Sequence, residues 1–137
     1  MAVLVDTSGL YALVDADDQS HLAVRAFVTR NREALVVPVT VLPELDYLVA
    51  TRLGIGPELQ VLEAVAGGEL RLEGLTLPDL RRAVELVRRY ADSEIGLVDA
   101  SIVAVAERLG ITRILTRDHR HFRAFRPRHC AAFELVP

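Results

Sequence analysis

The sequence predicts an α/β fold built on a parallel sheet, and two observations carry that prediction. Short apolar runs that suit buried strands alternate along the chain with longer stretches that suit helices. Several runs, including residues 2–5 and 34–38, are apolar at consecutive positions, as in strands covered by helices on both faces. With 137 residues, 51% of them hydrophobic, the chain has the size of one domain, residues 1–137, with one core.

The first half of the chain predicts two strands, residues 2–5 and 34–38, and four helices. The helices are expected over residues 8–14, 21–31, 40–53 and 57–66. Ser20 is a candidate cap for the second of them. Pro43 fits the third because a proline is tolerated in the first turn, and Gly54 ends that helix.

The second half predicts three more strands and two helices. Strands are expected over residues 69–75, 113–116 and 132–136, the last at an edge of the sheet. Thr76 and Asp79 form a capping-box pattern that opens a helix running to about Tyr90. Residues 97–109 form the most apolar helix, which we expect to be central because apolar side chains occupy nearly every side. The whole pattern favours four to five parallel strands with helices on both faces.

Charge is unevenly distributed along the chain. The net charge is −3, but residues 108–128 hold seven arginines and a single acid, Asp118. A basic stripe beside an acidic body can attract a phosphate backbone whatever the net charge. No apolar stretch approaches the roughly 20 residues that span a bilayer, and the N-terminus lacks a basic leader. The single cysteine excludes an internal disulfide, so we expect a cytoplasmic protein without a membrane partner.

Four acids stand where elements of the predicted fold begin or end. Asp6 follows the first strand, and Asp118 follows the strand at 113–116. Glu44 and Asp99 lie in first turns of helices. Because ligands bind at the carboxyl ends of parallel strands, these acids are expected to share one crevice. Taken singly, each also has a structural interpretation as a cap, a first-turn acid or a turn residue.

Such a cluster predicts a particular chemistry. Packed carboxylates repel each other unless a cation joins them, and hard oxygen ligands select Mg²⁺, Mn²⁺ or Ca²⁺. No histidine or cysteine stands at a zinc-like spacing from the acids. A cation held by carboxylates suits phosphodiester hydrolysis, because it activates a water and shields the phosphoryl oxygens. The residues alone therefore favour a metal-assisted phosphodiesterase.

The same four positions resemble the motifs of PIN-domain ribonucleases, and in particular the VapC toxins of bacterial toxin–antitoxin pairs. VLVDTSGLYALV resembles the family's opening at Asp6, and TVLPEL supplies the second acid, Glu44. GLVDASIVAVAERLG is very similar to the VapC helix that carries the third acid, Asp99. ILTRDHRHF resembles the family's ending around Asp118. The resemblance covers the whole chain in the right order.

This resemblance implies a PIN fold and a Mg²⁺-dependent endoribonuclease in which Mn²⁺ substitutes. Asp6 and Asp99 would be the principal metal ligands, and Glu44 and Asp118 would complete the site. Hydroxyl support is implied from three residues, Thr7, Ser101 and, more weakly, Thr116. The implied substrates are tRNA or ribosomal RNA, whose cleavage stops translation. The implied partner is a VapB-type antitoxin, with a toxin homodimer and larger toxin–antitoxin assemblies on operator DNA.

Several assignments stay open at this level. Three arginines of the stripe are candidates for holding the RNA backbone, against an equal case for a solvated face or a protein contact: Arg117, Arg120 and Arg123. His119 and His121 are left out of the site, because water attack assisted by a metal does not require them. The alternatives to the toxin are an RNA-processing nuclease without an antitoxin and a non-catalytic PIN-like binding module. A phosphotransfer enzyme with Asp6 as nucleophile is disfavoured because Ser8 replaces the second aspartate it needs.

Overall fold

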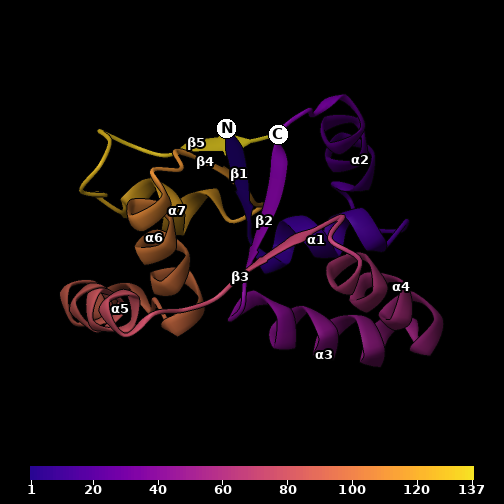
Figure 1. Cartoon of the computed structure of the whole chain (residues 1–137), viewed down its shortest axis with the longest axis horizontal. Coiled ribbons are helices and arrows are strands. Elements are labelled where there is room, and N and C mark those ends of the chain that lie inside the picture. The colour runs from indigo at the N-terminus through magenta and orange to yellow at the C-terminus, as the bar shows by residue number, and fades with distance from the viewer.

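Five parallel strands form the sheet at the centre of the molecule (Figure 1). A computed structural model describes all 137 residues. The strands are β1 (Ala2–Val5), β2 (Ala34–Pro38), β3 (Arg71–Glu73), β4 (Arg113–Leu115) and β5 (Glu134–Val136). Their order is β3-β2-β1-β4-β5, so the first strand of the chain is the central one. The predicted parallel sheet is confirmed, and so is the position of the last strand at an edge.

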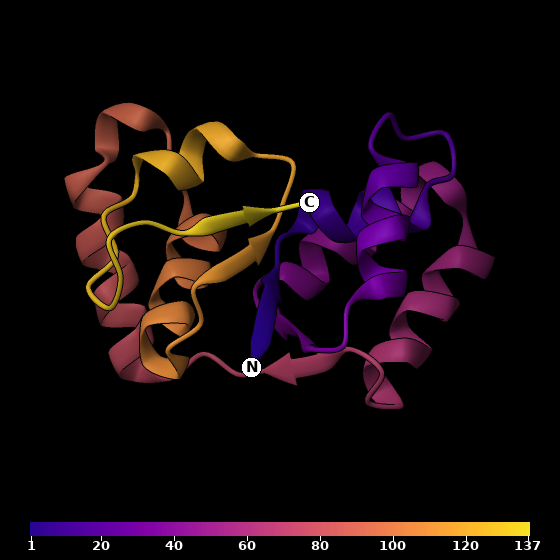
Figure 2. The same ribbon diagram turned by 90° about the horizontal axis from the view of Figure 1, so that it is seen from above.

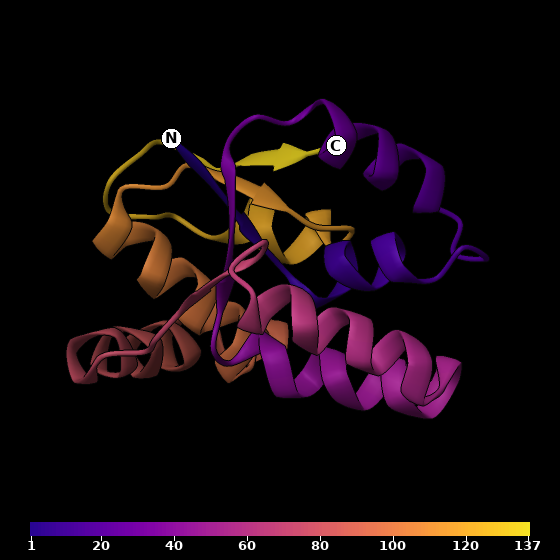
Figure 3. The same ribbon diagram turned by 45° about the vertical axis from the view of Figure 1, so that its right-hand side comes forward.

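Helices cover both faces of the sheet. They are α1 (Thr7–Val14), α2 (His21–Arg30), α3 (Val41–Leu53), α4 (Ile55–Ala66), α5 (Leu77–Arg89), α6 (Leu97–Leu109) and α7 (His119–Ala124), with one 3₁₀ turn, η1 (Ala91–Ser93). The first four lie on one side of the strands and the last three on the other (Figures 1 and 2). On the first side, α3 and α4 pack side by side (Figure 3). No helix is both long and apolar enough to cross a bilayer.

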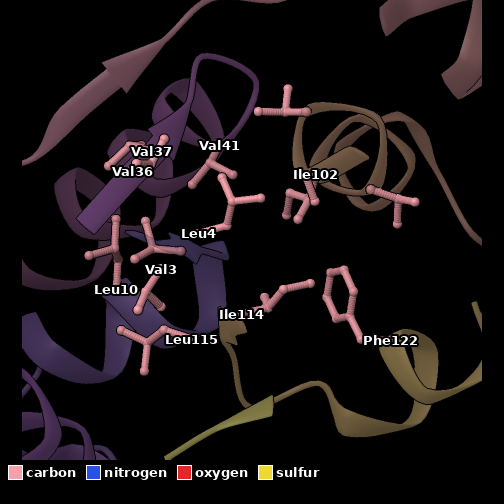
Figure 4. Close-up of a cluster of buried hydrophobic side chains, with 14 of the residues drawn as sticks. Val3, Leu4, Leu10, Val36, Val37, Val41, Ile102, Ile114, Leu115 and Phe122 are labelled. Carbon is pink, nitrogen blue, oxygen red and sulfur yellow. The ribbon is translucent and has the colours of Figure 1, made fainter. Parts of the chain in front are cut away.

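The core lies on both faces of β1 and its two neighbours. Val3, Leu4 and Val5 of β1 are fully buried, as are Ile114 and Leu115 of β4. Figure 4 shows side chains of the surrounding helices converging on these strands, among them Leu10, Val41, Ile102 and Phe122. Burying each such side chain contributes roughly 1.5–3 kcal/mol. Two of the four predicted acids, Asp6 and Asp118, lie just beyond the ends of these buried strands β1 and β4.

Some predicted boundaries were wrong, and each error has a local cause. The strand expected over 69–75 is reduced to β3, and the one over 132–136 to β5, because short edge strands pair on one side only. The helix expected from Pro57 begins at Ile55, with the proline in its first turn. Ser20 makes no capping hydrogen bond from its side chain. The capping box of Thr76 and Asp79 is confirmed.

One helix was not predicted at all. The six residues of α7 follow β4 and include two arginines and two histidines, a composition that suggests a solvent-exposed segment. Phe122 of α7 and Phe125 just beyond it are nearly fully buried, and the Phe125 ring meets Tyr90 edge-on at 5.1 Å between centroids. These two rings anchor α7 to the core, so its first turn has a fixed position beside the sheet.

Helix α1 approaches β4 so closely at Gly9 that a larger residue does not fit. A Cβ at position 9 would lie 2.5 Å from the Leu115 carbonyl oxygen, a backbone atom that cannot rotate away. We expect Gly9→Ala to destabilise the fold by about 1–3 kcal/mol, as overpacking does. In Gly56→Ala, where nothing lies within 4 Å, we expect a change of less than about 1 kcal/mol. Urea unfolding of both variants measures the difference, and equal stabilities would contradict the close contact.

Candidate metal and active site

Asp6 lies at the carboxyl end of the central strand and is 5% exposed. Its position is fixed because its backbone N–H donates to the Leu115 carbonyl of β4 at 3.0 Å. One carboxylate oxygen, Oδ1, accepts from the Thr7 backbone N–H at 2.8 Å and so caps α1. The other, Oδ2, accepts from the hydroxyls of Thr116 (2.8 Å) and Ser8 (3.1 Å). The carboxylate is thus held by three hydrogen bonds from the chain that surrounds it.

Burial and hydrogen bonding act on Asp6 in opposite directions. Burial raises the pKa of this carboxyl because it removes water from the charged form, and the nearby Asp118 raises the pKa further. The hydrogen bonds from Thr116, Thr7 and Ser8 lower the pKa, but they do not fully offset burial. The net pKa is raised, so the folded chain would gain from a positive charge at this end of β1.

The chain after β4 brings a second acid and a histidine to the same edge. The Thr116 hydroxyl accepts from the Asp118 backbone N–H at 2.9 Å, so one side chain ties Asp6 to the turn that carries Asp118. Asp118 then caps α7, because its Oδ1 accepts from the His121 backbone N–H at 3.2 Å. Nδ1 of His121 lies 2.7 Å from Oδ2 of Asp118 and 3.4 Å from Oδ2 of Asp99. His121, which the sequence analysis left out of the site, therefore lies beside two of the four acids.

Asp99 reaches the cluster from the first turn of α6. Burial, together with the negative charges of Asp6 and Asp118, raises the pKa of Asp99 to about 6, and His121 opposes this shift. Its carboxylate thus titrates close to neutral pH, which is expected where several acids share one site without a cation.

Glu44 lies in the first turn of α3, and it is more exposed than the other three acids. The start of its helix is tied to α6, because the hydroxyls of Thr40 and Ser101 lie 2.5 Å apart. Ser101 also donates to the Val98 carbonyl at 2.7 Å. This link holds the first turns that carry Glu44 and Asp99 in one relative position.

A cleft of about 310 Å³ joins these groups. All four predicted acids line it, together with Asp18, Thr7, Ser8, Tyr11, Leu48, Arg52 and Arg117. Two of the lining residues are cationic, and Arg117 is already paired with Asp18 at 3.0 Å. The guanidinium of Arg52 stacks over the Tyr11 ring at 5.2 Å and has no carboxylate partner. Carboxylates therefore outnumber cations in the cleft, and the donor set fits a hard divalent ion.

The predicted basic stripe is largely neutralised by acids from other parts of the chain. Four of its seven arginines form ion pairs: Arg108 with Asp79 and Glu73, Arg113 with Glu33 and Glu134, Arg117 with Asp18, and Arg128 with Glu85. Arg126 donates to the carbonyls of Arg123 and Phe125. Arg120 and Arg123 are exposed without a carboxylate partner, but neither lines the cleft. Of the three arginines proposed for RNA, the cleft contains Arg117.

The three hydroxyl residues expected to support the acids have different contacts. Thr116, ranked weakest, bonds directly to Asp6. The Thr7 hydroxyl is buried without a partner, and this residue contributes its backbone N–H instead. Ser101 contacts Thr40 and no acid. The sequence analysis left His121 out of the site and did not assign Ser8 or Arg52 to it. A hydroxyl two residues after a capping aspartate is a signal that could have indicated Ser8. The position of Arg52 depends on tertiary packing, and that of His121 on the unpredicted helix α7.

The fold and the acid cleft together define a class of protein, and comparison with known proteins supports the same class. A family model described as PIN domain matches residues 3–126. The chain therefore belongs to the PIN-domain family. It is 42% identical over 135 residues to Ribonuclease VapC26 of Mycobacterium tuberculosis, a match that covers 98% of this chain and all of that protein. The resemblance to VapC proteins is confirmed.

Solved structures give the same result for the fold. The crystal structure of Mycobacterium tuberculosis VapC20, a sarcin–ricin loop cleaving toxin, superposes with a TM-score of 0.80 at 25% identity, over 86% of this chain and 91% of that one. VapBC2 from Rickettsia felis, solved bound to a promoter DNA fragment, matches over the full length of both chains with a TM-score of 0.70 at 15% identity.

The contrast between Thr116 and Thr7 gives a matched test of the hydrogen bonds around Asp6. Both side chains are buried, and valine has nearly the shape of threonine. Thr116→Val removes the hydroxyl that serves Asp6 and Asp118, so we expect a loss of about 1–3 kcal/mol in unfolding free energy. Thr7→Val removes a buried hydroxyl without a partner, so we expect no loss of stability. Thermal and urea unfolding measure the stability of both variants. Similar losses of stability in the two would contradict the hydrogen bonds assigned to Thr116.

The raised pKa of Asp99 predicts a pH dependence of stability in the absence of metal. A group whose pKa is higher in the folded state than the unfolded value of 3.8 stabilises the fold most at low pH, and the stabilisation is lost as the pH rises through about 6. In EDTA, the unfolding free energy of Asp99→Asn relative to that of the wild type should therefore rise by about 2 kcal/mol between pH 4 and pH 7, after allowance for partial exposure. Asp92→Asn, at an exposed site, is the control. A constant difference between Asp99→Asn and the wild type over this range would refute the shift.

Proposed function

We propose that this chain is a metal-dependent endoribonuclease and the toxin of a type II toxin–antitoxin pair. The observation that supports it most is the convergence of four acids from β1, α3, α6 and the end of β4 on one cleft. Membership of the PIN family and 42% identity to a ribonuclease of the VapC group support RNA as the substrate. We further propose tRNA or ribosomal RNA as the substrate class. The chain would act in the cytoplasm as one PIN domain, residues 1–137.

Asp6 and Asp99 would be the principal ligands of Mg²⁺ or Mn²⁺, with Glu44 and Asp118 completing the site directly or through water. Such a cation lowers the pKa of a bound water and shields charge on the phosphoryl oxygens. The chain's own contribution is to hold these oxygens rigidly. Thr116, Thr7 and Ser8 orient the carboxylate of Asp6, and the link between Thr40 and Ser101 keeps α3 and α6 in register.

Two arginines that line the cleft could bind the phosphate backbone of an RNA strand. Arg117 is oriented by Asp18, whose side chain is 9% exposed, and Arg52 is oriented by the ring of Tyr11. A guanidinium pre-oriented in this way loses little entropy when it binds a phosphate. Both arginines would position the RNA, while Arg120 and Arg123 on α7 would serve an extension of the same strand outside the cleft.

A VapB-type antitoxin is the partner that the relatives support. Neighbouring structures include VapBC2 from Rickettsia felis on promoter DNA and a toxin–antitoxin complex from Klebsiella pneumoniae, which matches with a TM-score of 0.69 at 18% identity. We also propose a toxin homodimer and a larger toxin–antitoxin assembly for this chain. An acidic cleft of this kind suits a basic side chain of a partner, which would occupy the position of the cation.

RNA cleavage by the purified chain tests the proposal. Total cellular RNA is incubated with the protein in Mg²⁺, Mn²⁺ or EDTA, and the new 5′ ends are mapped. Asp6→Asn and Asp99→Asn should each reduce the cleavage rate by more than the roughly 100-fold that the loss of an outer hydrogen-bond partner of a metal site produces. Asp17→Asn removes an exposed carboxylate outside the cleft and should cleave like the wild type.

The outcomes separate the candidate functions. Discrete cuts that need metal and vanish in both site variants support the nuclease. Cleavage that persists in both variants contradicts the assigned acids. A folded wild type that makes no cuts with any cation would favour a non-catalytic binding module of the same fold.

A further inference from the structure

The imidazole of His121 is the one nitrogen donor that the fold brings to the acid cluster. Its Nδ1 atom lies 2.7 Å from Oδ2 of Asp118 and 3.4 Å from Oδ2 of Asp99. Although the approach to Asp118 is short, its angle does not fit a hydrogen bond, so Nδ1 is a buried polar atom without a hydrogen-bond partner. A buried nitrogen in this position is costly unless something else satisfies it.

The spacing of these three atoms is that of neighbouring ligands around one ion. In octahedral coordination with bonds of 2.0–2.1 Å, adjacent ligand atoms are about 2.9 Å apart. The separations of Nδ1 from the two carboxylate oxygens bracket that value, and the three donors all lie within 4.8 Å of one another. They could therefore contact a single cation with small side-chain adjustments.

Local structure holds the ring in this place. Oδ1 of Asp118 caps α7 by accepting from the backbone N–H of His121. Oδ2 of the same carboxylate faces the imidazole ring of His121. The next residue, Phe122, is 1% exposed and fixes the rotation of the helix against the core. The sequence Asp-His-Arg-His thus builds two ligands in a single turn: a carboxylate at its first position and an imidazole at its fourth.

We propose that His121 is a direct metal ligand through Nδ1, beside Asp99 and Asp118, and that it makes the site prefer Mn²⁺ and other transition-metal ions over Mg²⁺. The preference follows because imidazole nitrogen binds first-row transition metals well, whereas Mg²⁺ takes oxygen ligands. This inference rests on the proposed metal-dependent function and adds a ligand and an ion preference to it.

Pulsed electron paramagnetic resonance of Mn²⁺ bound to the full chain tests the proposal directly. A histidine nitrogen bonded to Mn²⁺ couples to its electron spin, and the wild type should show this ¹⁴N coupling. Labelling the protein with ¹⁵N-histidine should replace it by a ¹⁵N coupling without any mutation. His121→Gln should lose the coupling, and His119→Gln, on the same short helix, should keep it.

Metal affinity gives a second readout that does not depend on activity. His121→Gln should weaken Mn²⁺ binding by about tenfold or more, with a much smaller change for Mg²⁺, measured by calorimetry on protein whose folding is checked by circular dichroism. Mn²⁺ bound without nitrogen coupling, a coupling that survives in His121→Gln, or equal losses for both ions would overturn the proposal. If RNA cleavage still needs Asp6 and Asp99 in that case, the inference alone fails; if Mn²⁺ does not bind and RNA is not cut, the proposed function fails with it.

Discussion

The site depends on one electrostatic constraint: several carboxylates must be held close together at an edge of the sheet, and the innermost of them is buried. Asp6 experiences this most, because it ends the central strand and is 5% exposed. The hydrogen bonds from Thr116, Thr7 and Ser8 reduce the cost of its charge, yet its pKa stays raised. The pKa of Asp99 on α6 is also raised, to about 6, by burial and by the charges of Asp6 and Asp118. A divalent cation removes this repulsion, which is why the same geometry that destabilises the metal-free chain suits a metal site.

The fold delivers this geometry through strand order. Because β1 lies between β2 and β4, the chain segments leaving these three strands meet at one edge, and the acids after β1 and β4 become neighbours. Thr116 joins those two segments by contacting both Asp6 and the turn of Asp118. The pair of Thr40 and Ser101 joins the two helices that carry the remaining acids. Hydroxyl groups thus act as the connections between elements, while the carboxylates stay directed at the cleft.

Much of this was predictable from the sequence, and the failures have a common cause. Strands of consecutive apolar residues and the capping box at Thr76 depend on local patterns, so they were predicted correctly. The convergence of Asp6, Glu44, Asp99 and Asp118 followed from the rule that parallel strands present their carboxyl ends together. His121 was left out of the site because helix α7, which places it beside Asp118, was not predicted. Arg52 was not assigned to the site because its position depends on how α3 packs against α1. The ion pairs of the arginine stripe could not be predicted either, because the acids that pair with four of its arginines are distant in the sequence.

The most direct test of this account is the pKa of Asp99, followed by carbon-13 NMR of its carboxyl group in EDTA and then in saturating Mg²⁺. Without metal we expect a pKa of about 6, because burial and the neighbouring carboxylates disfavour the charged form. With Mg²⁺ bound, we expect the pKa to fall below the ordinary value of 3.8, because the cation favours the carboxylate. A pKa near 3.8 in EDTA, or one that Mg²⁺ leaves unchanged, would contradict the claim that these acids form a strained site that a cation relieves.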